Sequence, residues 1–194
     1  LTTIVRDRHG APLANPAFGA APAGFNALVA FNALELAELT GDGRMRATAL
    51  ELAEVLARRW SGELATWIDG GPAEAGSGRI RTLDALLPLL VDPDRGQQVL
   101  DLMIDPARYG GPCGPAGMHR DETVFEPHTY WRGSSWPQLT YLSWVGAARL
   151  GSPARAALAQ MLVLGATRSG FAEHWHPDTG APLGAVPQSW STLA

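Results

Sequence analysis

The sequence has a single cysteine and lacks any segment of 18 consecutive apolar residues. The lone thiol, Cys113, cannot form an internal disulfide, which fits a reducing compartment such as the cytoplasm better than a disulfide-rich secreted domain. Because a transmembrane helix needs a longer apolar segment than the chain offers, we expect no membrane span.

Basic charge is also sparse. The chain has 15 Lys and Arg residues against 19 Asp and Glu residues, a net charge of −4, and its cations are scattered along the sequence. A nucleic-acid partner requires a basic stripe along the phosphate backbone, so we expect none. With 46% hydrophobic and 18% charged residues in 194 positions, the composition predicts one folded domain with a sizeable core.

Strand-like alternation is rare, and helical periodicity dominates. Gly41–Gly43 separates the first two helices, Pro88 must kink or shorten the third, and Ser135 and Gln138 have the spacing of a capping box. Residues 64–69 fit a short strand or a helical turn. The pattern predicts an all-α protein of paired helices, as in an α/α barrel or an α-solenoid, with helices over 23–40, 44–60, 81–91, 92–104, 135–150 and 153–168.

Irregular sequence occupies two further regions. Residues 1–22 contain three prolines and predict an extended connection into the first helix. Residues 105–127 form a long Gly- and Pro-rich loop, and a loop of this length in a compact domain is usually functional or disordered. Both ends of the sequence look cut, so we expect a fragment of a longer protein.

The stretch from Gly170 to Gly180 carries the most distinctive chemistry, a carboxylate among aromatic rings before a Pro-Asp-Thr-Gly turn. If the segment is extended, Phe171, Glu173 and Trp175 share one face, while His174 and His176 share the other. Partial desolvation by the rings would adapt Glu173 to general acid or base work. An ordinary surface glutamate near a turn is the alternative.

Tryptophan is concentrated in the last third of the chain. Trp144 falls inside a predicted helix and is best explained as core. Trp131, Trp136, Trp175 and Trp190 lie in or beside loops, where flat rings can stack on the apolar faces of a sugar. The alternative is that they pack the loops onto the helices beneath.

Other chemistries are poorly supported. The four histidines at 119, 128, 174 and 176, with Glu173 and Cys113, match no zinc-ligand spacing, so we expect no metal site and no cofactor. Ser134-Ser135 lacks the setting of a nucleophile elbow, and the glycines near residue 114 do not follow a strand as a phosphate-binding loop would.

Three motifs together resemble glycoside hydrolase family 63. They are Tyr-Trp-Arg-Gly-x-x-Trp-Pro at 130–137, Gly-Phe-x-Glu-x-x-x-Pro-x-Thr-Gly at 170–180 and Gln-Ser-Trp-Ser at 188–191, supported by matching pieces at 81–90 and 119–121. The closer likeness is to bacterial members that hydrolyse glucosylglycerate or mannosylglycerate. It covers nearly the whole chain, and trehalases and related α/α-barrel glycosidases share it in looser form.

The resemblance implies an (α/α)6 barrel, a six-hairpin toroid, of which residues 1–194 form the C-terminal part of one catalytic domain. It implies inverting hydrolysis of a small α-glycoside with Glu173 as the general base. The family's general acid is an Asp in a Trp-Asp motif of the N-terminal half, and this sequence has no such motif. We therefore expect the fragment alone to be inactive and poorly soluble, with apolar helix faces such as 25–39 uncovered.

The resemblance also assigns roles to the surrounding residues. Tyr130, Trp131 and Trp136 match positions that line the sugar and aglycone pocket, Gln188 matches a polar contact to the substrate, and Trp190 is expected to wall the pocket beneath Glu173. Structural or supporting roles fall to Arg132, His174 and Trp175. The expected partner is a small-molecule glycoside, with glucose or mannose, the aglycone and the oligomeric state left open. The alternatives are a trehalase-like enzyme and a non-catalytic helical scaffold that binds carbohydrate or a partner.

Overall fold

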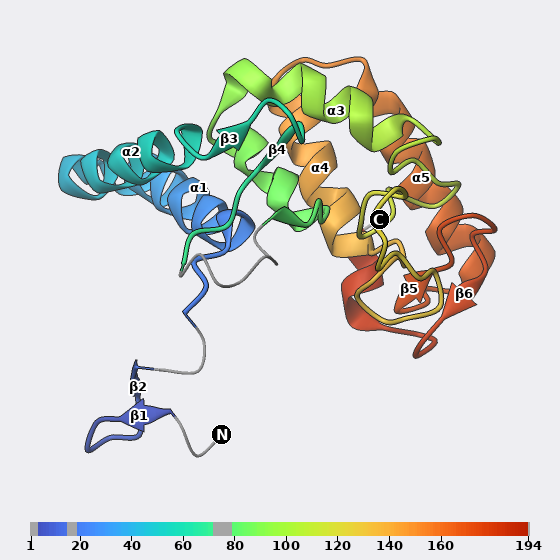
Figure 1. The fold of residues 1–194 in the computed structure, drawn as a ribbon, viewed down its shortest axis with the longest axis horizontal. Helices are drawn as coiled ribbons and strands as arrows, with labels where there is room; N and C mark the ends of the chain where they lie inside the picture. Colours follow the sequence, from blue (N-terminus) through green and yellow to red (C-terminus); the bar gives the residue numbers. More distant parts are fainter. Residues whose placement is uncertain (1–3, 15–18, 72–78, 194) are drawn as a thin grey trace.

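The computed structural model describes residues 4–14, 19–71 and 79–193, and most of its regular structure is helical (Figure 1). The helices are α1 Ala23–Thr40, α2 Gly43–Ala57, α3 Gly96–Ile104, α4 Pro137–Arg149 and α5 Ala154–Ser169, with 3-10 helices η2 Asp84–Leu90, η3 Pro93–Arg95 and η4 Ser189–Leu193. Three antiparallel two-stranded sheets are formed by β1 Val5–Arg6 with β2 Pro12–Ala14, β3 Trp60–Ser61 with β4 Thr66–Trp67, and β5 His174–Trp175 with β6 Pro182–Leu183.

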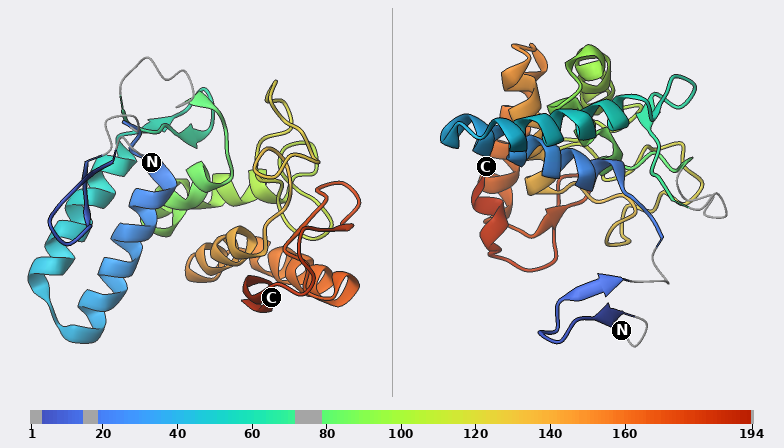
Figure 2. Two further views of the ribbon diagram at one scale, coloured as in Figure 1. Left: turned by 90° about the horizontal axis from the view of Figure 1, so that it is seen from below. Right: turned by 90° about the vertical axis from the view of Figure 1, so that its left-hand side faces the viewer.

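Helices α1 and α2 form an antiparallel hairpin at one end of the molecule (Figure 2). The predicted break between them is confirmed. Gly41 takes a left-handed φ of 71° and donates its N–H to the carbonyl of Ala37, and the Asp42 carboxylate accepts from the N–H groups of Arg44 and Met45. Helix α2 ends at Ala57, earlier than predicted, because the chain turns into the β3–β4 hairpin. Of the two conformations predicted for residues 64–69, the strand is the one observed, as β4.

Among the described residues, helix α1 is covered mainly by α2 and η2. Leu39 is 85% exposed and Phe25 is 65% exposed, and Val29 and Leu36 are about half exposed. Within the described part of the chain, the apolar face predicted for residues 25–39 is therefore largely open to solvent, and α4 meets α1 through Arg149, which pairs with Glu35 and lies over the Phe31 ring.

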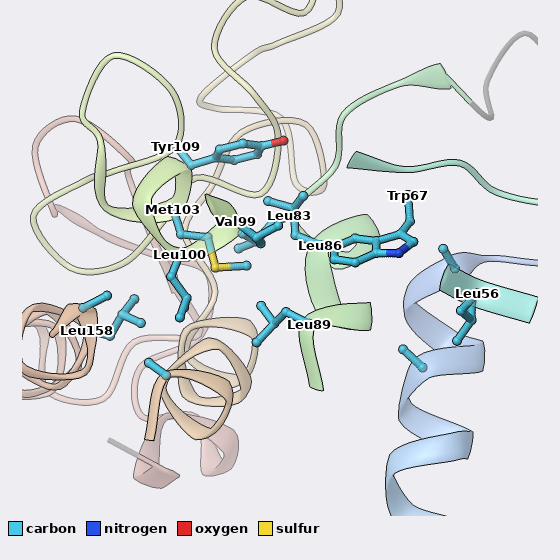
Figure 3. Packing of buried hydrophobic residues seen from close by; sticks show 14 residues of the cluster. Leu56, Trp67, Leu83, Leu86, Leu89, Val99, Leu100, Met103, Tyr109 and Leu158 are labelled. Carbon is cyan, nitrogen blue, oxygen red and sulfur yellow. The ribbon is translucent and has the colours of Figure 1, made fainter. Parts of the chain in front are cut away.

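The core lies between the α1–α2 hairpin and the α4–α5 pair, with η2 in the middle (Figure 3). Pro88 shortens the predicted 81–91 helix into the 3-10 helix η2, in which all six residues after Asp84 are buried. Leu89 lies against α4, where a β-carbon on Gly146 would come within 1.9 Å of it, and Leu83 and Leu86 belong to the same buried cluster. The predicted 92–104 helix is present as η3 followed by α3, although the Asp92 side chain makes no capping bond.

The predicted capping box at the start of α4 is wrong. The N-cap residue is Trp136, and it makes no side-chain capping bond. The Ser135 hydroxyl instead donates to the carbonyl of Gly114, 2.9 Å away, and the Gln138 Oε1 atom is buried with no hydrogen-bond partner among the described residues. Tertiary pairing with the long loop thus takes the hydroxyl that would have capped the helix.

The long loop is ordered by strand-like pairing on both of its sides. Thr82 forms a bridge with Met118, and Ala116 forms one with Ser135. At its edge, Arg81 Nε donates to Glu122 Oε1 across 2.5 Å, with both side chains less than 20% exposed. The loop is therefore a fixed layer beside the helices.

The N-terminal stretch contains more structure than the extended connection that we predicted. Val5 pairs with Ala14, and the Asp7 carboxylate accepts from the N–H groups of His9 and Ala11 to close the turn. This local turn chemistry makes a hairpin, which lies apart from the helices in Figure 1. Residues 1–3 and 15–18 of the stretch are outside the described residues. In the described part of the chain, no helix is long and apolar enough to span a membrane.

Candidate active site

Two backbone hydrogen bonds join the motifs at 130–137 and 170–180. The N–H of Ser135 donates to the carbonyl of Trp175, and the N–H of Trp175 donates to the carbonyl of Ser135, both across 2.9 Å. Strand β5 pairs on its other side with β6, His174 opposite Leu183. The segment before α4 and the β5–β6 hairpin therefore form one small irregular sheet that carries both motifs.

The Glu173 carboxylate is held at the edge of this sheet by two donors. The Tyr130 hydroxyl donates to Oε1, and the N–H of Ala185 donates to Oε2 across 3.0 Å. A reverse backbone bond, from Glu173 N–H to the Ala185 carbonyl at 2.8 Å, fixes the same pair of residues. Both carboxylate oxygens are thus oriented by the protein.

These donors determine the protonation state of the carboxyl. The hydrogen bond from Tyr130, followed by the one from Ala185, lowers the pKa of Glu173 below its ordinary value, since both favour the charged form. The same bond raises the pKa of the Tyr130 hydroxyl. Hydrogen bonding outweighs the desolvation that we expected from the rings. This arrangement therefore favours the ionised form of Glu173.

Aromatic rings form a stacked wall beside Glu173. Trp131 stacks on Trp136 with ring centroids 4.0 Å apart, and Trp136 stacks in turn on His174 at 4.6 Å. Tyr130 stands edge-on to all three rings, at centroid distances of 4.8 to 5.5 Å. Trp131 is 55% exposed and Trp136 is fully buried. Trp136, expected to line the pocket, therefore lies behind Trp131 and supports the wall from within.

His174 closes the buried end of the stack. Its ring is 5% exposed, and its Nδ1 atom is buried with no hydrogen-bond partner in this structure. Burial lowers the pKa of His174, with the Glu173 charge opposing that shift. The neutral imidazole can be buried face to face against Trp136 without the desolvation cost that the protonated form would incur.

The predicted alternation of faces along 171–176 is wrong. Phe171 has a left-handed φ of 64° and is 40% exposed, so the extended conformation begins only after it. Trp175 is fully buried, and its ring lies where a β-carbon on Gly165 of α5 would come within 2.3 Å of it. The structural role expected for Trp175 fits this position, which fastens β5 to α5.

The other predicted residues lie at different distances from the carboxylate. The indole N–H of Trp190 donates to the Glu173 carbonyl at 3.0 Å, so this ring lies against the backbone beneath Glu173. Gln188 is half-buried, and its side-chain oxygen accepts from the N–H and hydroxyl of Ser189. Arg132 is exposed, and none of the ion pairs between described residues includes it.

Sequence reasoning missed two contributors to the site. Ala185 contributes a backbone N–H, and the type of residue at a position does not predict such a contact. Gly184 adopts a φ of 73°, and a β-carbon there would lie 2.4 Å from Glu173 Oε2, so only glycine leaves room for the carboxylate. The presence of a glycine a few residues beyond the Pro-Asp-Thr-Gly turn was the sequence feature that could have indicated this close approach.

Arg120 anchors the turn of the same hairpin. It donates to the Asp178 carboxylate and to the carbonyls of Gly110 and Pro177. A cavity of about 410 Å³ lies beside this anchor, lined by Arg120, Asp178, Met161 and neighbouring loop residues, and neither Glu173 nor the ring stack lines it. Among the described residues, no group of three or more His, Cys, Asp or Glu side chains is placed to hold a metal ion.

Comparison with known proteins agrees with the interpretation of the motifs. The family profile of the mannosylglycerate hydrolase MGH1-like glycoside hydrolase domain matches residues 2–191. A glucosylglycerate hydrolase of Mycolicibacterium hassiacum is 38% identical over 106 residues, which are 52% of this chain and 24% of that protein. The chain thus spans about a quarter of the length of this curated relative.

Solved structures share the fold. The family 63 mannosylglycerate hydrolase of Thermus thermophilus in complex with glucose superimposes with a TM-score of 0.77 at 23% identity, covering 90% of this chain and 44% of that one. The complex of that enzyme with Tris and D-glycerate gives a TM-score of 0.76 at 22% identity, with the same coverage. A fold shared over nine-tenths of the chain and a family profile that includes both motifs confirm the resemblance: the chain belongs to the mannosylglycerate hydrolase MGH1-like glycoside hydrolase domain family.

Proposed function

We propose that this chain is part of an inverting glycoside hydrolase that cleaves a small α-glycoside such as glucosylglycerate or mannosylglycerate, with Glu173 as the general base. The observation that carries the proposal is the Glu173 carboxylate, kept ionised by Tyr130 and the Ala185 N–H beside an exposed aromatic wall. Family membership and the named activities of the relatives support the substrate class.

In the proposed mechanism, a water molecule lies between Glu173 and the anomeric carbon. As the water attacks, Glu173 removes its proton, and a carboxylic acid on the opposite side of the sugar protonates the departing oxygen. Inverting enzymes place the two carboxyl groups roughly 6.5 to 9.5 Å apart to leave room for the water. A base must be unprotonated before the reaction begins, and the two hydrogen bonds on Glu173 support the assignment because they favour its charged form.

The exposed indole of Trp131 offers a flat apolar face for the sugar, and the Tyr130 ring stands at right angles to it. Trp136 and His174 hold Trp131 in place from behind. We assign Trp190 to the floor beneath Glu173. Gln188 would contact the substrate only after its side chain leaves Ser189.

We further propose that residues 1–194 form the C-terminal part of one (α/α)6 barrel whose other half supplies the general acid Asp. The exposed apolar residues of α1, together with Val163 on α5, support this placement, because an adjoining helical layer would cover them. The chain alone is then expected to be inactive. A cytoplasmic location is consistent with the buried free thiol of Cys113.

The test uses the protein in which this chain is joined to the preceding half of the domain. Release of glucose or mannose from the two glycerate glycosides is measured, and the anomer first formed is identified by NMR. Glu173→Gln is expected to lower turnover by about 10²- to 10⁴-fold. Glu63→Gln, at an exposed surface ion pair with Arg79, is the matched control. Near-normal turnover by the Glu173 variant, or retention of anomeric configuration, would overturn the assignment.

A further inference from the structure

The turn that follows Glu173 is tied to the long loop by one side chain, Arg120. Its Nη1 donates to the Asp178 carboxylate, and its Nη2 donates to the carbonyls of Gly110 at 2.9 Å and Pro177 at 3.3 Å. The guanidinium also lies over the Phe125 ring, 5.7 Å from its centroid. The Arg120 side chain is only 18% exposed, so its bonds to the two carbonyls are partly shielded from solvent, whereas the Asp178 carboxylate is about half exposed.

The acceptors come from two parts of the chain. Gly110 belongs to the long loop, whereas Pro177 and Asp178 lie in the turn of the β5–β6 hairpin. A planar guanidinium with five N–H donors can satisfy all three acceptors together, which a lysine ammonium on a flexible stem cannot do with the same geometry. Tight backbone packing accompanies the bonds, since a β-carbon on Gly111 would lie 2.3 Å from the Pro177 carbonyl.

The β5–β6 hairpin connects the turn held by Arg120 to the Glu173 carboxylate. His174 pairs with Leu183 and Trp175 with Pro182, so the position of the turn fixes the register of the two strands. Beyond these pairs the N–H of Glu173 reaches the carbonyl of Ala185, past the extra residue Gly184, and the Ala185 N–H that holds Glu173 Oε2 comes from the segment directly after β6. If the turn moves, this donor moves relative to the carboxylate.

We infer that Arg120 is a positioning residue: by clamping the turn at Pro177 and Asp178 to Gly110, it keeps the Ala185 N–H on Glu173 and so holds the carboxylate aimed at its water. Arg120 does this without touching substrate. Its effect on catalysis rests on the proposed function, while its effect on the hairpin does not.

The test compares Arg120→Met and Asp178→Asn with Arg108→Met, in the protein that contains the whole domain. Arg108 is the matched control because it belongs to the same loop and makes an exposed ion pair with Asp121 at 3.4 Å. Three quantities are measured: kcat and KM for the glycoside, the acid limb of the pH profile, and amide hydrogen exchange of the peptide containing Ala185.

Both clamp variants are expected to lower kcat, by about 10- to 100-fold for Arg120→Met, as for other small misplacements of a reacting group, with KM changed less than about threefold. The acid limb is expected to move to higher pH, because Glu173 loses a donor that favours its charged form. Exchange at Ala185 is expected to accelerate. Arg120→Lys is expected to fall between the wild type and Arg120→Met.

The inference is overturned if Arg120→Met and Arg108→Met give the same kcat and the same exchange at Ala185. If Arg120→Met does not fold, Asp178→Asn decides by the same criteria, since it removes only the charge of one acceptor. Should Glu173→Gln retain activity, the proposed function fails, and the exchange at Ala185 alone then decides whether Arg120 holds the hairpin.

Discussion

Ser135 and Trp175 exchange a reciprocal pair of backbone hydrogen bonds, each 2.9 Å long, although they are 40 positions apart in the sequence. Ser135 lies just before α4, and Trp175 ends β5. The pair places the Tyr130 hydroxyl on the Glu173 carboxylate, and it explains why two motifs separated by a helical hairpin work at one place.

Tyr130→Phe is predicted to shift the pH dependence of hydrolysis. Its hydrogen bond favours ionised Glu173, so removing the hydroxyl raises the pKa of that carboxyl toward its ordinary value. Less of the base is then ionised at low pH, and the acid limb of kcat/KM moves to higher pH. The measurement is a pH–rate profile from about pH 3 to 8, bracketing an ordinary Glu pKa. An unmoved acid limb, with Tyr141→Phe as the comparison variant, would contradict the assignment.

Gly165→Ala in α5 is predicted to destabilise the protein by about 1 to 3 kcal/mol, because its methyl group would overlap the buried Trp175 ring. Gly43→Ala in α2 has open space around the added carbon and is expected to be neutral or slightly stabilising. Urea unfolding of both variants measures the difference. Equal midpoints would mean that the Trp175 ring moves aside easily.

Leu39→Ser tests whether α1 is covered in the whole protein. In the chain alone Leu39 is 85% exposed, so the change is expected to alter the unfolding free energy by less than about 0.5 kcal/mol. In the protein with the preceding half attached, Leu39 would be buried, and Leu39→Ser would then lower the unfolding free energy by about 1.5 to 3 kcal/mol. Leu86→Ala, fully buried in η2, is the reference and should cost about 2 to 5 kcal/mol in both proteins. The same small effect of Leu39→Ser in both would argue against the barrel.

Acid is predicted to weaken the fold through His119 and His174. Burial lowers the pKa of each imidazole below its ordinary value, near 6.5. As pH falls below about 6.5, the unfolded chain binds protons that the folded chain does not, so the unfolding free energy decreases, by at most about 1.4 kcal/mol per pH unit for each imidazole. Urea unfolding between pH 7.5 and 5.5 measures this slope. His174→Gln should flatten it, and an unchanged slope in this variant would contradict the prediction.

Much of the helical framework follows from local sequence. The bounds of α1 were predicted to the residue, because Pro22 precedes it and Gly41 ends it, and Pro88 shortened the helix that contains it. The start of α4 was mispredicted, because the Ser135 hydroxyl found a partner 21 residues away in Gly114. Local spacing cannot anticipate such a competitor.

The sequence by itself determined that the protein is mainly helical, that it belongs among family 63-like glycosidases, and that Glu173 and the tryptophans near it are the residues to examine. These features follow from the hydrophobic periodicity and from short sequence motifs. Only the tertiary structure decided that Trp136 lies behind Trp131, that Phe171 departs from the strand, and that Tyr130, Ala185 and Gly184 surround the carboxylate. The physical reason is that these relations depend on backbone hydrogen bonds and van der Waals contacts between distant segments, which exist only once the loop, β5 and α4 have packed together.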